Sequence, residues 1–189
     1  MSTAKRPHYS YDEYLRALKD GNLKLEYCDG VIYAMAGGTP AHAELAAAVI
    51  GVFRPQLLGR CSVYSSDLKV RIEASDLSTF PDVSVVCGPR QTSTLDANAI
   101  TNPSILVEVT SRSTEDYDRG EKVSHYKQLP SLQAVLIVSH RSRRITSITR
   151  TATGWEEREA RSGETLRLAT PALELDVDFV YAGIEVDPE

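Results

Sequence analysis

Two apolar stretches that each contain one acidic residue decide the fold: Phe80-Pro-Asp-Val-Ser-Val-Val86 and Ile105-Leu-Val-Glu-Val109. Such short apolar runs predict buried strands. An ionised carboxylate is costly to bury unless a cation or hydrogen-bond donors compensate it. Asp82 and Glu108 together therefore indicate a metal site. Mg²⁺ is usually held by one or two carboxylates with waters and substrate phosphates, which favours phosphodiester chemistry.

Composition is that of an ordinary globular protein. The 189 residues are 42% hydrophobic and 25% charged, and no linker-like segment divides them, so we expect one domain over residues 1–189. No stretch approaches the roughly 20 apolar residues of a transmembrane helix, and the amino terminus lacks the apolar core of a signal peptide. We expect a cytoplasmic protein without a membrane partner.

Cys28, Cys61 and Cys87 fit neither a disulfide framework nor a zinc pattern, so we expect small, reduced, buried side chains.

The elements outside these strands follow from capping and turn signals. Ser10-Tyr-Asp-Glu13 is a capping box for a helix to about Asp20, and Asp29-Gly30 predicts a hairpin turn between 23–27 and 31–36. Thr39-Pro40 begins a helix to about Leu58. Strands are expected at 62–73, 81–87 and 104–110, a second helix from the Ser113–Asp116 cap to Gln128, then strands at 134–139, 145–150, 155–158 and 165–168. From residue 40 the order is α-β-β-β-α-β.

Each acidic residue also has a structural interpretation. Asp82 follows Pro81 at the start of a strand, and its structural interpretation is a turn or edge residue. Glu108 has apolar neighbours on both faces of its strand, and its alternative is a structural ion pair with an arginine or lysine.

Three basic or aromatic features are further candidates. Asp118, Lys122 and Tyr126 share one helix face, which indicates either a solvated ion-pair stripe or a lysine delivered to the metal site. His42 lies in the first turn of its helix, and a surface or core histidine is its plainer interpretation. Glu26, before the hairpin turn, and Lys69 are weaker candidates. For the basic segment His140–Arg144, a solvated turn is a more favoured interpretation than a contact with DNA phosphates.

The ordered set of motifs resembles one family. Pro81-Asp82, Leu106-Val-Glu-Val-Thr-Ser111 and Ser113–Lys122 with Tyr126 resemble the Uma2 family (domain of unknown function 820), in the PD-(D/E)xK restriction-endonuclease-like superfamily, and the resemblance extends from Tyr11 to the carboxyl end. It implies an α/β fold with an αβββαβ core, a mixed central sheet flanked by helices, an amino-terminal helix and hairpin, and carboxyl-terminal β additions.

The same resemblance implies a set of roles. Asp82 and Glu108 would hold Mg²⁺ or Mn²⁺, and Glu26 would be an additional acidic member. The usual lysine, two residues after the second carboxylate, is replaced by Thr110, and Lys122 is the natural substitute. His42, Tyr126 and Lys69 would line the substrate cleft.

Three functions compete at this point. The first is a metal-dependent DNA endonuclease, with a homodimer expected if both strands are cut. The second is a nuclease-like fold that only binds DNA or regulates, which Thr110 and the net charge of −5 favour. The third is a nucleotide or small-molecule phosphate hydrolase with the same carboxylates.

Overall fold

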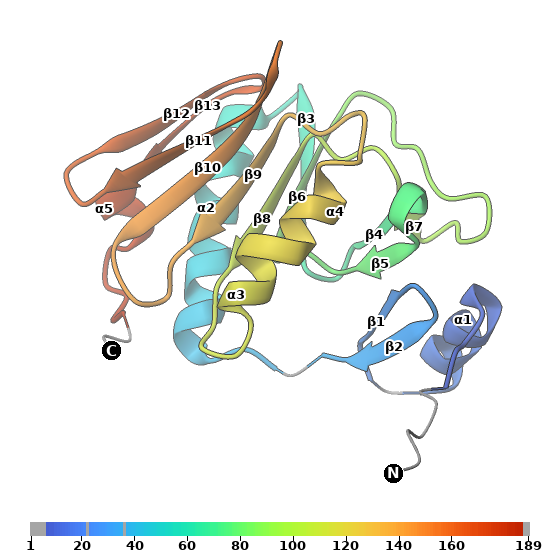
Figure 1. Cartoon of the computed structure of the whole chain (residues 1–189). Helices are drawn as coiled ribbons and strands as arrows, with labels where there is room; N and C mark the ends of the chain where they lie inside the picture. Colours follow the sequence, from blue (N-terminus) through green and yellow to red (C-terminus); the bar gives the residue numbers. More distant parts are fainter. Residues whose placement is uncertain (1–6, 22, 36, 187–189) are drawn as a thin grey trace.

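A six-stranded mixed sheet, in the order β11-β10-β9-β8-β6-β3, forms the centre of the fold (Figure 1). The computed structural model describes residues 7–21, 23–35 and 37–186. The strands of this sheet are β3 (Cys61–Ser65), β6 (Val83–Cys87), β8 (Ile105–Val109), β9 (Ala134–Val138), β10 (Arg144–Thr151) and β11 (Gly154–Arg161). Only β8 and β9 run parallel, because a helical crossover connects them, and the other neighbours are antiparallel.

Helices cover both faces of this sheet. The long helix α2 (Pro40–Leu57) lies behind it, and a helical segment made of α3 (Glu115–Tyr117), η2 (Asp118–Lys122) and α4 (Val123–Tyr126) lies in front (Figure 1). Taken in chain order, α2, β3, β6, β8, this segment and β9 give the expected αβββαβ core. The predicted α/β fold with a mixed, helix-flanked sheet is therefore confirmed.

Alternation along β8 decides where Glu108 points. Ile105, Val107 and Val109 pack in the apolar cluster that includes α2, whereas Leu106 packs with Val123 and Tyr126 of α4. Since successive side chains of a strand face opposite sides, Glu108 points toward the α3–α4 segment. The carboxylate thus enters the face that also carries Lys122.

A second, five-stranded sheet lies beside the first, in the order β2-β1-β5-β4-β7. Its strands are β1 (Leu25–Cys28), β2 (Val31–Ala34), β4 (Lys69–Ile72), β5 (Leu77–Thr79) and β7 (Ala99–Ile100), with the one-turn helix η1 (Glu73–Ser75) between β4 and β5. Helix α1 (Tyr11–Asp20) packs on it through a cluster of Tyr11, Tyr14 and Tyr27. The chain passes from β5 to β6 through Phe80–Asp82, so Asp82 lies where the two sheets meet.

The carboxyl-terminal part adds the hairpin β12 (Thr165–Ala169) and β13 (Ala172–Asp176) and the short helix α5 (Val177–Val180). The hairpin packs over α2 and adds Leu166, Leu168, Leu173 and Leu175 to the core. Among the described residues, no helix combines the length and the apolar character needed to cross a membrane.

Local signals placed the first three elements well. Ser10 and Glu13 form the expected capping box of α1, and the Thr39 hydroxyl accepts a hydrogen bond from the His42 N–H at the start of α2. Asp29 and Gly30 both adopt positive φ in the β1–β2 turn, as a tight hairpin requires.

Two predicted elements were wrong in their extent. The strand expected at 62–73 is two strands, β3 and β4, in different sheets, because the polar residues Ser66 and Asp67 form a turn between them. The helix expected from its Ser113–Asp116 cap to Gln128 begins at Glu115, without a side-chain cap, and ends at Tyr126. Its middle, η2, is a π-helical turn. β5, β7, β13 and α5 were not predicted.

The expectation of three reduced cysteines was also wrong. Cys61 and Cys87 form a disulfide, and only Cys28 is free among the described cysteines. The two bonded residues are 26 apart in sequence but are direct partners across β3 and β6. The pairing follows from the register of that antiparallel pair, which the spacing of cysteines does not reveal.

Adjacent leucines at the end of α2 test the packing of the central sheet. Leu57 is fully buried and Leu58 is 65% exposed. We expect Leu57→Ala to lower the free energy of unfolding by about 2–5 kcal/mol, since it leaves a cavity in the core. Leu58→Ala, the matched control, should change it by no more than about 0.5 kcal/mol. Urea denaturation measures both, and equal losses would contradict this packing.

Candidate active site

Four carboxylates and one lysine gather where the two sheets meet the helical segment. Lys122 lies at the centre, with its Nζ 3.1 Å from Glu108 Oε2, 3.6 Å from Asp118 Oδ1 and 3.7 Å from Glu26 Oε1. Lys122, Glu108 and Asp118 are each 5% exposed or less. The fourth carboxylate, Asp82, lies close enough to raise the pKa values of Glu108 and Asp118 by charge repulsion.

Lys122 and Asp118 both lie in the π-helical turn and both are buried. η2 contains both residues, and they form an i,i+4 ion pair buried against β8. π-turns inside helices occur frequently at functional sites. The four-residue spacing predicted a shared face, but the interpretation as a solvated stripe was wrong because both side chains are buried.

Three of the four carboxylates each accept a hydrogen bond from a neighbouring group of the fold. Tyr126 donates its hydroxyl to Glu108 Oε1, and Thr79 donates its hydroxyl to Glu26 Oε1. The backbone N–H of Val109 donates to Asp82 Oδ2 at 2.7 Å. These donors orient the carboxylates, which leaves their remaining lone pairs for a cation.

His42 and Asp82 form the most exposed side of the cluster. His42 Nε2 lies 3.3 Å from Asp82 Oδ2, and their side chains are 21% and 15% exposed. The hydrogen bond to Asp82 raises the pKa of His42, although burial opposes that shift. The imidazole therefore carries positive charge to a higher pH than usual.

Burial and charge act in opposite directions on the central pair. Burial raises the pKa of Glu108 to about 8, with repulsion from Asp82 and Asp118 adding to the shift and Lys122 opposing it. Burial lowers the pKa of Lys122, but attraction to Glu108, Glu26 and Asp118 outweighs it, and the net shift is upward. The two groups titrate as one unit. We take the lysine as charged because three carboxylate oxygens lie within 3.7 Å of it.

The donor chemistry of the cluster fits a hard divalent cation. Carboxylate oxygens are the protein ligands that Mg²⁺ prefers, and Asp82 and Glu108 face the same space. No three His, Cys, Asp or Glu side chains form a ready-made metal cage within residues 7–21, 23–35 and 37–186. A site of two carboxylates completed by waters and substrate phosphate needs no such cage.

Thr110, two residues after Glu108, is held by contacts within the fold. It is fully buried, and its hydroxyl oxygen lies 2.8 Å from His140 Nδ1 and within hydrogen-bond distance of the Val138 carbonyl oxygen. Lys122 contacts the Glu108 carboxylate from η2 of the helical segment.

Two residues expected to line the cleft are buried and paired with other side chains. Tyr126 is fully buried behind Glu108, so it positions that carboxylate and does not meet solvent. Lys69 pairs with Asp96 at 2.5 Å and lies over the Tyr14 ring, so its ammonium is committed to the α1 contact. Both side chains are buried, and their assignment to the substrate cleft stays a prediction. Asp118 and Thr79 are the cluster members that sequence reasoning did not assign.

The basic segment between β9 and β10 is mostly neutralised. Arg141 and Arg144 contact Glu115, and Arg143 contacts Asp178. His140 is 9% exposed, so it is not part of a solvated turn as expected. This segment therefore ties β10 to the helical segment and offers few free cations for phosphates.

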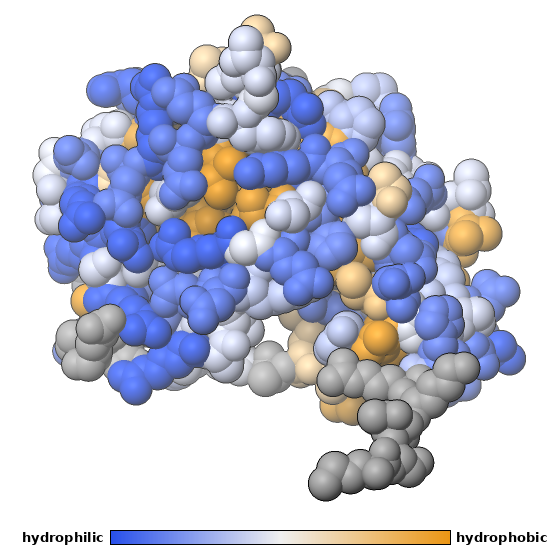
Figure 2. Space-filling model, in the orientation of Figure 1, coloured by the Kyte–Doolittle hydropathy of each residue, from blue (hydrophilic) through white to orange (hydrophobic). Residues whose placement is uncertain are grey.

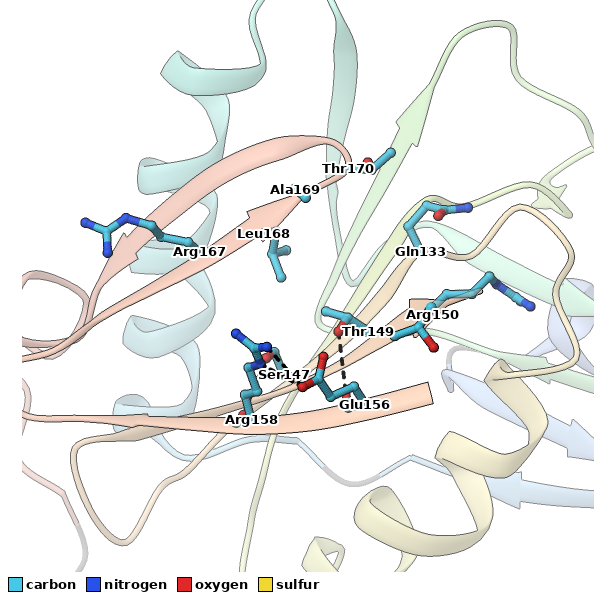
Figure 3. Close-up of a pocket in the computed structure, with 11 residues that line it drawn as sticks. Gln133, Ser147, Thr149, Arg150, Glu156, Arg158, Arg167, Leu168, Ala169 and Thr170 are labelled. Carbon is cyan, nitrogen blue, oxygen red and sulfur yellow. Dashed lines mark hydrogen bonds and ion pairs between the residues drawn. The ribbon is translucent and has the colours of Figure 1, made fainter. Parts of the chain in front are cut away.

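A separate polar pocket lies between β10, β11 and the β12–β13 hairpin (Figure 3). It has a volume of about 280 Å³. Figure 2 shows a hydrophobic patch framed by hydrophilic residues on the face of the molecule turned toward the viewer. Its arginines are engaged: Arg150 donates to the Leu129 and Leu132 carbonyl oxygens, Arg158 pairs with Glu156, and Arg167 pairs with Glu174. The pocket offers one acidic lining residue, Glu156, and so lacks the paired carboxylates of the cluster around Lys122.

Comparison with known proteins identifies the family of this chain. The Uma2 family model, described as "Putative restriction endonuclease", matches residues 11–178. The chain belongs to the Uma2 family. The uncharacterized protein slr1290 of Synechocystis sp. (strain ATCC 27184 / PCC 6803 / Kazusa) is 38% identical over 96% of this chain and 96% of its own length. The uncharacterized protein sll1609 of the same organism is 28% identical over 67% of this chain and 72% of its own.

A solved structure shares the fold of this Uma2 member. It is a crystal structure from Anabaena variabilis ATCC 29413 described as a "putative nuclease belonging to DUF820". The two superpose with a TM-score of 0.71 over 92% of this chain and 98% of that chain, at 17% identity. At this identity the likeness shows that the two chains share one fold.

Adjacent glycines before α2 test the placement of His42. A Cβ on Gly38 would lie 2.7 Å from His42 Nδ1, whereas a Cβ on Gly37 would meet nothing within 4 Å. We expect Gly38→Ala to push the imidazole away from Asp82, so the pKa of His42 should fall toward its ordinary value. Gly37→Ala, the matched control, should leave it raised. NMR titration of the imidazole measures both, and an unchanged pKa in Gly38→Ala would contradict the geometry.

Removal of the central ammonium tests the charge balance. We expect Lys122→Met to cost about 3–5 kcal/mol of unfolding free energy, because it leaves buried carboxylates without a cation. Without Lys122 the pKa of Glu108 rises further, so the variant should be most stable at low pH and lose stability as pH increases. Adding Glu108→Gln should restore part of the loss.

The control for this series is Lys19→Met, because Lys19 is exposed at the end of α1. Thermal or urea unfolding across pH measures all the variants. A Lys122→Met protein as stable as Lys19→Met at neutral pH would show that the carboxylates do not depend on this lysine.

Proposed function

We propose that this Uma2 protein is a metal-dependent DNA endonuclease that hydrolyses phosphodiester bonds. The observation that supports this most is the buried Lys122–Glu108 pair at 3.1 Å beside Asp82, at the meeting point of two sheets. Purely structural pairs seldom collect three carboxylates around one lysine, because each buried charge must be desolvated. Catalytic sites accept that cost.

Asp82 and Glu108 would hold Mg²⁺ or Mn²⁺, with Glu26 as an additional acidic member. Such a metal, when bound, polarises the phosphate and lowers the pKa of the attacking water. Loss of the Glu108 proton precedes that binding, so the activity should increase with pH as the carboxyl with a pKa of about 8 ionises.

Lys122 and His42 would handle the substrate charge. Lys122 can orient the attacking water and offset negative charge that builds on the phosphate. His42, kept protonated by Asp82, can donate a hydrogen bond to a phosphate oxygen at the exposed side of the cluster. Asp118 positions Lys122 from the preceding turn of the same segment.

A nuclease fold that only binds DNA is the second candidate function. One observation favours it: the Lys122 ammonium occupies the space among Glu26, Glu108 and Asp118 that a cation would use. If no metal displaces or joins that ammonium, the cluster is a structural ion-pair network. A homodimer remains our proposal for a protein that cuts both strands of a duplex.

Nicking of supercoiled plasmid tests the endonuclease. We expect purified protein to nick in Mg²⁺ or Mn²⁺, and nicking to be lost with chelator and in Asp82→Asn, because the first metal carboxylate is gone. Asp116→Asn is the matched control, since Asp116 is an exposed carboxylate of α3 outside the cluster. It should nick like the wild type.

Gel analysis of nicked and linear plasmid reports each outcome. If the wild-type protein never nicks DNA with either metal, the endonuclease proposal is rejected and DNA binding is the remaining candidate function. Nicking that survives both the chelator and Asp82→Asn would place the activity elsewhere.

A further inference from the structure

A groove of about 480 Å³ opens beside the candidate active site. Two of its lining residues, His42 and Asp82, belong to the carboxylate cluster, so the groove is continuous with it. The rest of the lining comes from the residue just before β1, the residues before α2, α2 itself and the turn after β3. These lining residues are Lys24, Met35, Gly37, Gly38, Ala43, Ala46, Ala47, Ile50, Ser65 and Ser66.

The wall formed by α2 is unusually apolar for a face in contact with solvent. Ala43, Ala46, Ala47 and Ile50 are spaced by three and four, so they form one stripe on the helix. Ala46 and Ile50 are half-buried and also touch the core cluster of α2, which includes Leu45, Val49 and Phe53, whereas Ala43 and Ala47 are exposed. A surface helix normally carries polar residues opposite its core face.

The opposite rim of the groove is polar and carries a lysine. Lys24 Nζ lies 5.0 Å from the centre of the Phe80 ring and 3.8 Å from Asp67 Oδ1, and it donates to Ser66. Its side chain is 32% exposed, so the ammonium remains accessible from the groove. One end of the groove is thus apolar, and the other offers cationic and hydroxyl groups.

This combination matches one nucleotide. Ligand pockets of about 300–1,000 Å³ are mostly apolar with a few placed polar groups, and the groove lies in that range. A base of any identity can pack on an apolar wall, while the phosphate of the same nucleotide contacts a lysine. A stacked base pair within a duplex presents only its edges and cannot enter such a groove.

We propose that the groove holds an unpaired nucleotide of the substrate strand, next to the phosphodiester at Asp82, with the base on the α2 stripe and a phosphate at Lys24. The inference rests on the proposed function for its substrate. It names single-stranded or locally unpaired DNA as the preferred substrate class. A paired base would first have to leave the duplex, which costs unstacking and unpairing.

Binding without cleavage tests this directly. Fluorescence anisotropy with a short fluorescein-labelled oligothymidylate, in chelator, compares the wild type with Ala47→Leu and Ala43→Leu, whose added bulk fills the groove. Both alanines are exposed, so neither change disturbs the core. We expect each to weaken binding by about tenfold or more, a change of 1.4 kcal/mol. Ala152→Leu, the same change on the exposed β10–β11 turn, should bind like the wild type.

Two further comparisons sharpen the result. The wild type should bind the single strand more tightly than a blunt duplex of equal length. Lys24→Met should weaken binding and reduce the slope of its salt dependence by about one counterion. Equal affinity of wild type, Ala47→Leu and Ala43→Leu, absence of oligothymidylate binding by the wild type, or preference for the blunt duplex would each overturn the proposal.

The outcome is separable from that of the endonuclease. Strand binding that depends on Ala47 in a protein that never nicks DNA would support the groove and reject the proposed catalysis. Nicking of duplex plasmid that is unchanged in Ala47→Leu, with no single-strand preference, would support catalysis and reject the groove.

Discussion

The buried contact of Lys122 with Glu108, Glu26 and Asp118 is the interaction on which the site depends. It joins three separate parts of the fold: Glu108 comes from the central sheet, Glu26 from the second sheet, and Lys122 and Asp118 from the helical segment. A buried charge without a partner is strongly destabilising, so each part holds the others in register. The π-turn of η2 and the hydrogen bonds from Tyr126 and Thr79 serve the same arrangement.

Asp82 and His42 differ from this buried group because they reach solvent. Asp82 is fixed by the Val109 N–H, and His42 is fixed against Asp82 by its place in the first turn of α2. The site therefore has a rigid interior, where charge is set by burial, and an open side, where a substrate phosphate can arrive. The groove along α2 begins at that open side.

Much of the central fold was readable from the sequence, because its signals are local. The Ser10 capping box, the Thr39-Pro40 helix start and the apolar runs of β8 and β9 predicted their elements closely. Asp82 and Glu108 stood out as carboxylates in apolar surroundings, and the spacing of Lys122 placed it on a helix after Glu108. The fold places all three in one cluster, and the roles given to them remain proposals.

What the sequence did not reveal depends on contacts between distant residues. The Cys61–Cys87 bond follows from strand register, and Lys69 belongs to Asp96, a residue 27 positions away in another part of the chain. Tyr126 has the spacing of a cleft residue, yet packing behind Glu108 buries it.

The most direct test of the account is calorimetric titration of Mn²⁺ into the wild type and Glu108→Gln. The account predicts saturable binding by the wild type that is lost in the variant, and equal heats from both proteins would contradict it.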